Sequence, residues 1–146
     1  MNLTSTAFEN NEMIPPRFTC DGANLSPHMI IEQVPDSAES LVLIVDDPDA
    51  PDGLWTHWTL WNIDPRIEDV PEGGIVDSPI EGITSGGTKG YHGPCPSNGT
   101  HHYNFHLYAL DTKLDISSES EPDGLKEAMM GHVIDEARLT GLYQRR

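Results

Sequence analysis

Three segments of the 146-residue chain are rich in aliphatic, β-branched and aromatic residues and are bounded by proline, glycine, aspartate or asparagine. They are LVLIVDD at 41–47, LWTHWTLWNI at 54–63 and HHYNFHLYAL at 101–110. Runs of this length between turn-forming residues are typical of β-strands, and the first is apolar enough for a buried central strand. LTSTAF at 3–8 and HMIIEQV at 28–34 are shorter candidates. We therefore expect a mostly β protein.

One segment near the C-terminus predicts a helix. Residues 124–141 read GLKEAMMGHVIDEARLTG and carry an apolar stripe at helical spacing. Asp123 or Ser120 would cap the start of this helix, and Gly141 would end it in the left-handed conformation. The stripe consists of Leu125, Met129, Met130, Val133, Ile134 and Ala137.

The length of the chain fits one domain over residues 1–146, and the pattern of elements fits an antiparallel two-sheet β-sandwich with a C-terminal helix. Residues 71–100 hold eight glycines and four prolines without clear periodicity. A loop of this length in a compact domain is usually a binding surface. The alternative is that it contains edge strands, with GGIVD at 73–77 and GITSG at 82–86 as candidates.

The charge balance excludes one class of partner. The chain has 24 acidic and 8 basic residues and a net charge of −16, which repels nucleic acid. No apolar run approaches the ~20 residues of a membrane span, and no signal-peptide pattern opens the sequence, so we expect a cytoplasmic protein. Cys20 and Cys95 are then expected to be free thiols, with a disulfide between them as the alternative.

Polar side chains lie at the ends of the three main predicted strands. Alternation places Asp47 on the face of the apolar residues before it, and His101 and Tyr103 at the end of a face that runs into the core. On 54–63, alternation groups His57 with Trp61. Pairing of the strands would bring the acid, the imidazoles and the phenol together at one rim of the sheet.

Several motifs together resemble one protein family. DPDAP at 47–51, WTHW at 55–58, GPCP…HHY at 93–103 and IPPRFTCDGANLSP at 14–27 resemble the bacterial and archaeal Raf kinase inhibitor-like branch of the phosphatidylethanolamine-binding proteins. The resemblance covers essentially the whole chain. It implies a β fold of two antiparallel sheets, with a small pocket for phosphate or the phosphoryl headgroup of a lipid.

The resemblance also implies a set of site residues and partners. It suggests a cis Ala50–Pro51 bond, a homodimer, and a regulatory partner such as a kinase or protease, with no cofactor. The chain departs from the family pattern at His102, which stands where an arginine is usual, so a bidentate partner for a nearby carboxylate is lost. The ligand-binding residues that it implies are Asp47, Asp49, His57, Pro94, His101 and Tyr103.

The predicted pocket chemistry fits an anion. A phosphate needs N–H and O–H donors, which two imidazoles, a phenol and loop N–H groups supply. The aspartates would orient the imidazoles and raise their pKa, or accept hydrogen bonds from an ammonium headgroup. The DPDAP, WTHW and GPCP…HHY motifs contain no lysine or arginine, so binding would be weak and stronger at low pH. We therefore expect a non-enzymatic binding protein.

Two alternatives remain open from the residues. His101, His102 and His106 with Asp47 are zinc-ligand types, although neighbouring strand residues point in opposite directions. Cys95 near His101 would instead favour a thiol hydrolase.

Overall fold

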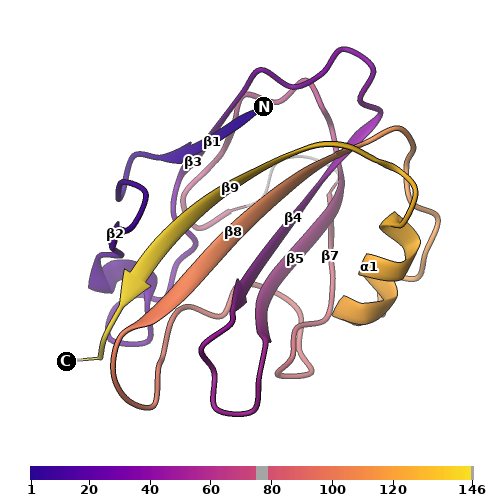
Figure 1. The fold of residues 1–146 in the computed structure, drawn as a ribbon. Helices are drawn as coiled ribbons and strands as arrows, with labels where there is room; N and C mark the ends of the chain where they lie inside the picture. Colours follow the sequence, from indigo (N-terminus) through magenta and orange to yellow (C-terminus); the bar gives the residue numbers. More distant parts are fainter. Residues whose placement is uncertain (75–78, 146) are drawn as a thin grey trace.

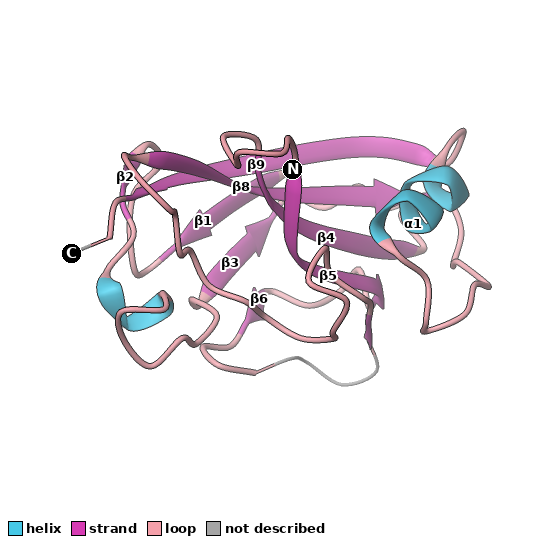
Figure 2. Ribbon diagram, turned by 90° about the horizontal axis from the view of Figure 1, so that it is seen from below, coloured by secondary structure: helices cyan, strands magenta, loops and turns pink. Residues whose placement is uncertain are grey.

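The computed structural model describes residues 1–74 and 79–145, and it confirms a mostly β fold of two sheets (Figure 1). The larger sheet has the strand order β2-β9-β8-β4-β5-β7, and the smaller has the order β1-β3-β6. Figure 2 shows the smaller sheet beside one face of the larger one. The elements in chain order are β1 (Asn2–Ser5), β2 (Glu12–Met13), the 3-10 helix η1 (Pro16–Phe18), β3 (Met29–Glu32), β4 (Ser40–Asp47), β5 (Trp55–Ile63), β6 (Asp69–Val70), β7 (Ile80–Glu81), β8 (His101–Leu110), α1 (Pro122–Met129) and β9 (Val133–Tyr143).

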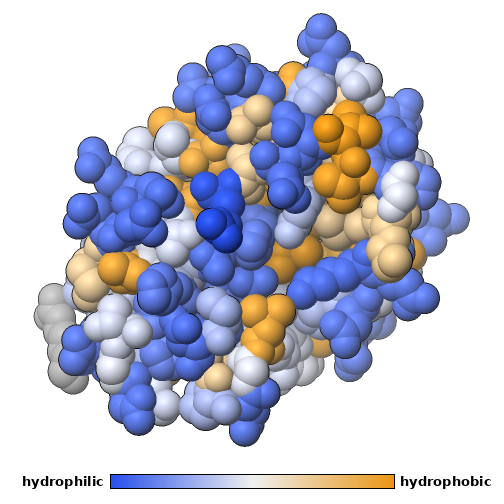
Figure 3. All heavy atoms as spheres, viewed as in Figure 1, coloured by the Kyte–Doolittle hydropathy of each residue, from blue (hydrophilic) through white to orange (hydrophobic). Residues whose placement is uncertain are grey.

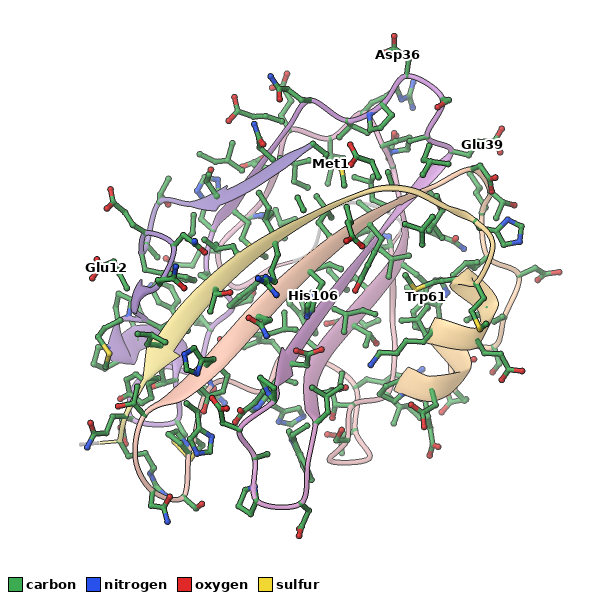
Figure 4. The ribbon with its side chains drawn as sticks, in the orientation of Figure 1. Met1, Glu12, Asp36, Glu39, Trp61 and His106 are labelled. Carbon is green, nitrogen blue, oxygen red and sulfur yellow. A yellow bond between two sulfur atoms is a disulfide. The ribbon has the colours of Figure 1, made fainter. Side chains whose placement is uncertain are left out.

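Strand β4 is the centre of the larger sheet. All of its residues are buried, and it pairs antiparallel with β5 on one edge and β8 on the other. Leu43 and neighbours at every second position face the core between the two sheets. Ile44 lies on the opposite face, in a second apolar cluster that α1 covers. Figure 4 shows Trp61, a member of this second cluster, beside α1.

The predicted helix over 124–141 is wrong in its second half. The helix spans Pro122–Met129, Gly131 then adopts a φ of 83°, and the chain continues as strand β9. Strand β9 pairs with β8 along its length, so its main-chain groups are bonded between strands. Alternate residues of β9, Ala137, Leu139 and Tyr143, face the core. Val133 and Ile134 of the predicted stripe are exposed instead.

The predicted ends of that helix are also corrected. The N-terminal cap is Glu121, whose side chain makes no capping hydrogen bond, and Pro122 occupies the first turn. Gly141 is not a left-handed terminator, since it lies inside β9 opposite Tyr103.

In the described part of the long loop after β6, one short edge strand, β7, pairs with β5. Of the two candidate strands, 73–77 lies partly outside the described residues. The other, 82–86, contributes only an isolated bridge from Ile83 to Lys89 in the described part of the chain. No helix among the described residues is long and apolar enough to cross a membrane. Figure 3 shows mostly hydrophilic side chains on one face of the molecule, with hydrophobic ones in separate small groups.

We predict that two glycines of this C-terminal region respond oppositely to alanine. A Cβ at Gly141 would lie 2.8 Å from Phe8 and closer still to Ile14, so Gly141→Ala should destabilise the fold by about 1–3 kcal/mol. At Gly124, within α1, the nearest atom to a new Cβ is 4.0 Å away on Ser120. Gly124→Ala should therefore stabilise the fold by up to about 1 kcal/mol, since alanine favours helix. Chemical denaturation of both variants measures these changes, and a Gly141→Ala variant as stable as the native chain would contradict the packing.

Candidate functional site

The antiparallel pairing of β4 gathers polar side chains at one end of the large sheet, the lower end in Figure 1. The last residue of β4 lies beside the first residues of β5 and β8. Asp47, His57, His101 and Tyr103 thereby line one pocket of about 460 Å³. Trp55 of β5 also lines the pocket, and the surrounding loops contribute further wall residues, among them Cys20, Thr84, His92, Cys95 and Ser97.

A β-bulge places His57 in this pocket. Val45 pairs with Trp58 and Asp46 pairs with Thr56, so His57 is an extra residue in β5 at the point where the register shifts. Simple alternation grouped His57 with Trp61, which instead lies under α1 on the other face. The bulge brings the His57 ring edge-on to Tyr103, with ring centroids 5.4 Å apart.

Asp47 and His101 form a buried pair at the base of the pocket. Asp47 is 3% exposed and His101 is 6% exposed. The His101 Nδ1–H group donates to Asp47 Oδ2 at 2.7 Å, and the Asp49 main-chain N–H donates to Asp47 Oδ1 at 2.8 Å. The carboxylate therefore has a partner on each oxygen, and the orientation of the His101 ring is fixed.

His57 is held in a neutral form by its surroundings. Burial lowers its pKa below the ordinary value of 6.5, and a hydrogen bond to His92 and the charge of Asp47 oppose this only in part. Asp47 thus raises the pKa of His57 as expected, but burial outweighs this effect and the net shift is downward. The His57 Nδ1–H group donates to the His92 carbonyl oxygen at 2.6 Å.

Tyr103 contributes a protonated hydroxyl. Burial raises the pKa of its phenol well above the usual range, and the charge of Asp47 raises it further. A hydrogen-bonding contact with the Asp47 carboxylate adds to this rise. The contact is not a well-formed hydrogen bond, and the hydroxyl has no well-formed hydrogen-bond partner among the described residues. It is therefore a buried donor that lines the pocket and is not satisfied by the described part of the chain.

Two of the predicted site residues lie outside the pocket wall. Asp49 Oδ2 accepts hydrogen bonds from the His102 main chain at 2.8 Å and from the His102 ring at 2.6 Å. These bonds lower the pKa of Asp49, with the ring as the main cause. His102 thus pairs with the carboxylate in place of the usual arginine. Pro94 is buried behind the wall, where its carbonyl oxygen accepts the Cys20 N–H at 3.1 Å.

Two further expectations are corrected at this end of the sheet. The peptide bonds of the described residues are all trans, so Ala50–Pro51 is not cis. Cys20 and Cys95 form a disulfide across 75 residues of sequence, so they are not free thiols in this structure. Both sulfur-bearing residues line the pocket.

Sequence reasoning missed several wall residues because they come from loops. Thr84 and His92 lie in the long loop, whose composition indicated a binding surface but not which residues face inward. Asn24 is also in the wall, and its side-chain oxygen accepts the Gly93 N–H at 2.9 Å. Trp55 is the tryptophan that lines the pocket and is 41% exposed, whereas the other two are buried.

Neither alternative chemistry gains support from the geometry. The proposed zinc ligands are dispersed, because His102 bonds Asp49 and His106 bonds Asp46, away from the Asp47–His101 pair. Within residues 1–74 and 79–145, no three histidine, cysteine or acidic side chains gather closely enough to hold a metal ion. The sulfur of Cys95 is bonded to Cys20 and is not available as a nucleophile in this state.

Comparisons with known proteins agree with the fold. A UPF0098 protein of Methanothermobacter thermautotrophicus is 49% identical to this chain over 150 residues, and the match covers 99% of each of the two chains. A UPF0098 protein of Pyrococcus horikoshii is 48% identical, over 97% of this chain and 76% of its own length.

Two crystal structures have the same fold. A phosphatidylethanolamine-binding protein homolog from Chlamydia trachomatis matches with a TM-score of 0.95 and 40% identity, over 99% of this chain and 97% of the other. Escherichia coli YbcL, described as a member of the mammalian phosphatidylethanolamine-binding protein family, matches with a TM-score of 0.92 and 28% identity. The match covers 99% of this chain and 98% of YbcL. The phosphatidylethanolamine-binding protein family model matches residues 4–144. The chain therefore belongs to the phosphatidylethanolamine-binding protein family.

Proposed function

We propose that the pocket binds a small anion, either phosphate or the phosphoryl group of a larger ligand, and that the chain is a binding protein without enzymatic activity. The observation that carries the proposal is the buried Tyr103 hydroxyl, which lines the pocket and has no partner among the described residues. A buried hydroxyl without a partner costs about 1–3 kcal/mol. A ligand oxygen that accepts its hydrogen bond would offset that cost.

The two imidazoles supply donors that depend on protonation. The Nδ1 atoms of His57 and His101 already donate to the His92 carbonyl and to Asp47, which leaves each Nε2 for a ligand. Nε2 accepts a hydrogen bond in the neutral ring and donates one in the protonated ring. The neutral rings suit a protonated phosphate, and the charged rings suit its anion.

The charge around the pocket limits the affinity. The wall formed by the described residues holds Asp47 and Asp52 but no lysine or arginine, and the chain carries a net charge of −16. Binding should therefore be modest and should favour ligands that also bring a positive group, such as the ammonium of a phosphoryl headgroup. A phosphorylated side chain of a partner protein presents the same phosphoryl group, and a role in regulating a kinase or protease would use the pocket in this way.

The first prediction concerns the Tyr103 hydroxyl. Tyr103→Phe should weaken the binding of inorganic phosphate by roughly tenfold, because a donor to a charged group is lost. The free energy of unfolding should stay the same or rise, since the hydroxyl that is removed has no partner in the described chain. Isothermal titration calorimetry and chemical denaturation measure the two effects.

Two other tyrosines serve as matched controls. The Tyr91 hydroxyl donates to the Phe18 carbonyl oxygen at 2.7 Å, so Tyr91→Phe should lose about 1 kcal/mol of stability. Tyr108 packs with the cluster on the opposite face of the sheet, so Tyr108→Phe should leave phosphate affinity unchanged. If Tyr103→Phe bound phosphate as tightly as the native chain, Tyr103 would not be the donor.

The second prediction concerns pH. Burial lowers the pKa of His57 in the free protein, and a bound anion would favour the protonated ring and raise this pKa. Binding then takes up protons, so affinity should rise as the pH falls from about 8 to about 5.5. Sulfate keeps its charge over this range and separates titration of the protein from titration of phosphate. A flat sulfate titration, or the same slope in His57→Gln, would contradict the role of His57.

A further inference from the structure

A covalent cross-link in the pocket wall reaches solvent. Cys20 follows η1, and Cys95 lies in the loop before β8. Both cysteines line the pocket and both are exposed, so a reductant in solution has access to the bond between them. Exposed disulfides are the ones that thiol–disulfide exchange reaches most readily.

Hydrogen bonds on one side of this cross-link do not depend on it. The Cys20 N–H donates to the Pro94 carbonyl oxygen at 3.1 Å, and the Gly93 N–H donates to Asn24 Oδ1 at 2.9 Å. These bonds remain when the cysteines are thiols. Reduction should therefore leave the fold and the first part of the loop in place.

The chain on the other side of the cross-link is held by fewer hydrogen bonds. Residues 96–100, named here the arm, lie outside the strands, and Pro96 has no N–H group to donate. Within the described residues, the side-chain hydrogen bond that holds the arm joins Thr100 Oγ1 to Gln144 Oε1 at 3.2 Å, at its far end. Pro96 and Ser97 of the arm line the pocket. The disulfide, together with the burial of Pro96, therefore fixes this part of the wall.

We propose that reversible reduction of the Cys20–Cys95 disulfide switches the pocket from a stronger to a weaker anion-binding state. This inference rests on the proposed anion-binding function. In the oxidised chain the arm is held on the wall before a ligand arrives. In the reduced chain the ligand must first order the arm, and the entropy that this costs lowers the affinity.

The reductant is a dithiol, which supplies the two electrons and two protons that the step requires. One of its thiolates attacks a sulfur of the Cys20–Cys95 bond and forms a mixed disulfide, with one cysteine leaving as a thiolate. The second thiol of the reductant then displaces the other cysteine and closes the reductant's own disulfide. Both cysteines end as thiols, and oxidation by a disulfide reverses the exchange.

The test measures inorganic phosphate binding to the full chain by calorimetry in three states: oxidised, reduced with dithiothreitol, and reoxidised. We expect the dissociation constant to rise roughly tenfold on reduction, within the range of couplings found in proteins, and to return on reoxidation. The Cys20→Ser/Cys95→Ser double variant should bind like the reduced chain whether or not dithiothreitol is present.

The outcomes separate this inference from the function on which it rests. Equal phosphate affinity in the oxidised and reduced chains would overturn the switch and leave anion binding intact. Absence of binding in both states would overturn both. Circular dichroism is recorded on each sample, and loss of the β signal on reduction would also overturn the switch, because the bond would then hold the whole fold rather than the arm.

Discussion

The double pairing of strand β4 is the constraint on which the rest of the molecule depends. Its side chains are buried on both faces and its edges are bonded to β5 and β8, so its position is fixed by burial worth about 1.5–3 kcal/mol for each large apolar side chain. Because both neighbours run antiparallel, the end of β4 meets the start of each of them. Asp47, His57 and His101 are neighbours for this reason, although His101 is far from the other two in sequence.

The histidines of this acidic chain divide into two groups by their partners. Five of them bond an aspartate, and His57 and His92 do not, since the former bonds a carbonyl oxygen and the latter bonds Thr88. Both exceptions line the pocket, where burial keeps His57 neutral. The pocket therefore combines one imidazole that is paired with a carboxylate and one that is bonded to a carbonyl oxygen. The aspartate-bonded histidines are His28, His101, His102, His106 and His132.

The hydrophobic periodicity of the sequence agrees with the observed strand pairing for most strands and differs from it in β9 and in β5. Val133, Ile134 and Ala137 fit a helical stripe, whereas Ala137, Leu139 and Tyr143 fit a two-residue period, and the bonds from β8 select the strand. In β5, regular alternation is broken by the bulge at His57, which depends on how β4 and β5 align. Periodicity describes one segment at a time, so it contains no information about register between segments.

Composition and local alternation are enough to predict the β class, the central strand at 41–47 and the four polar side chains near strand ends. The tertiary structure alone decided that β9 is a strand, that His57 turns toward Tyr103, and that Cys20 and Cys95 meet. Each of these depends on the distance between segments that are remote in the chain. Such distances are set by the packing of the two sheets and the course of the loops, which no short stretch of residues specifies.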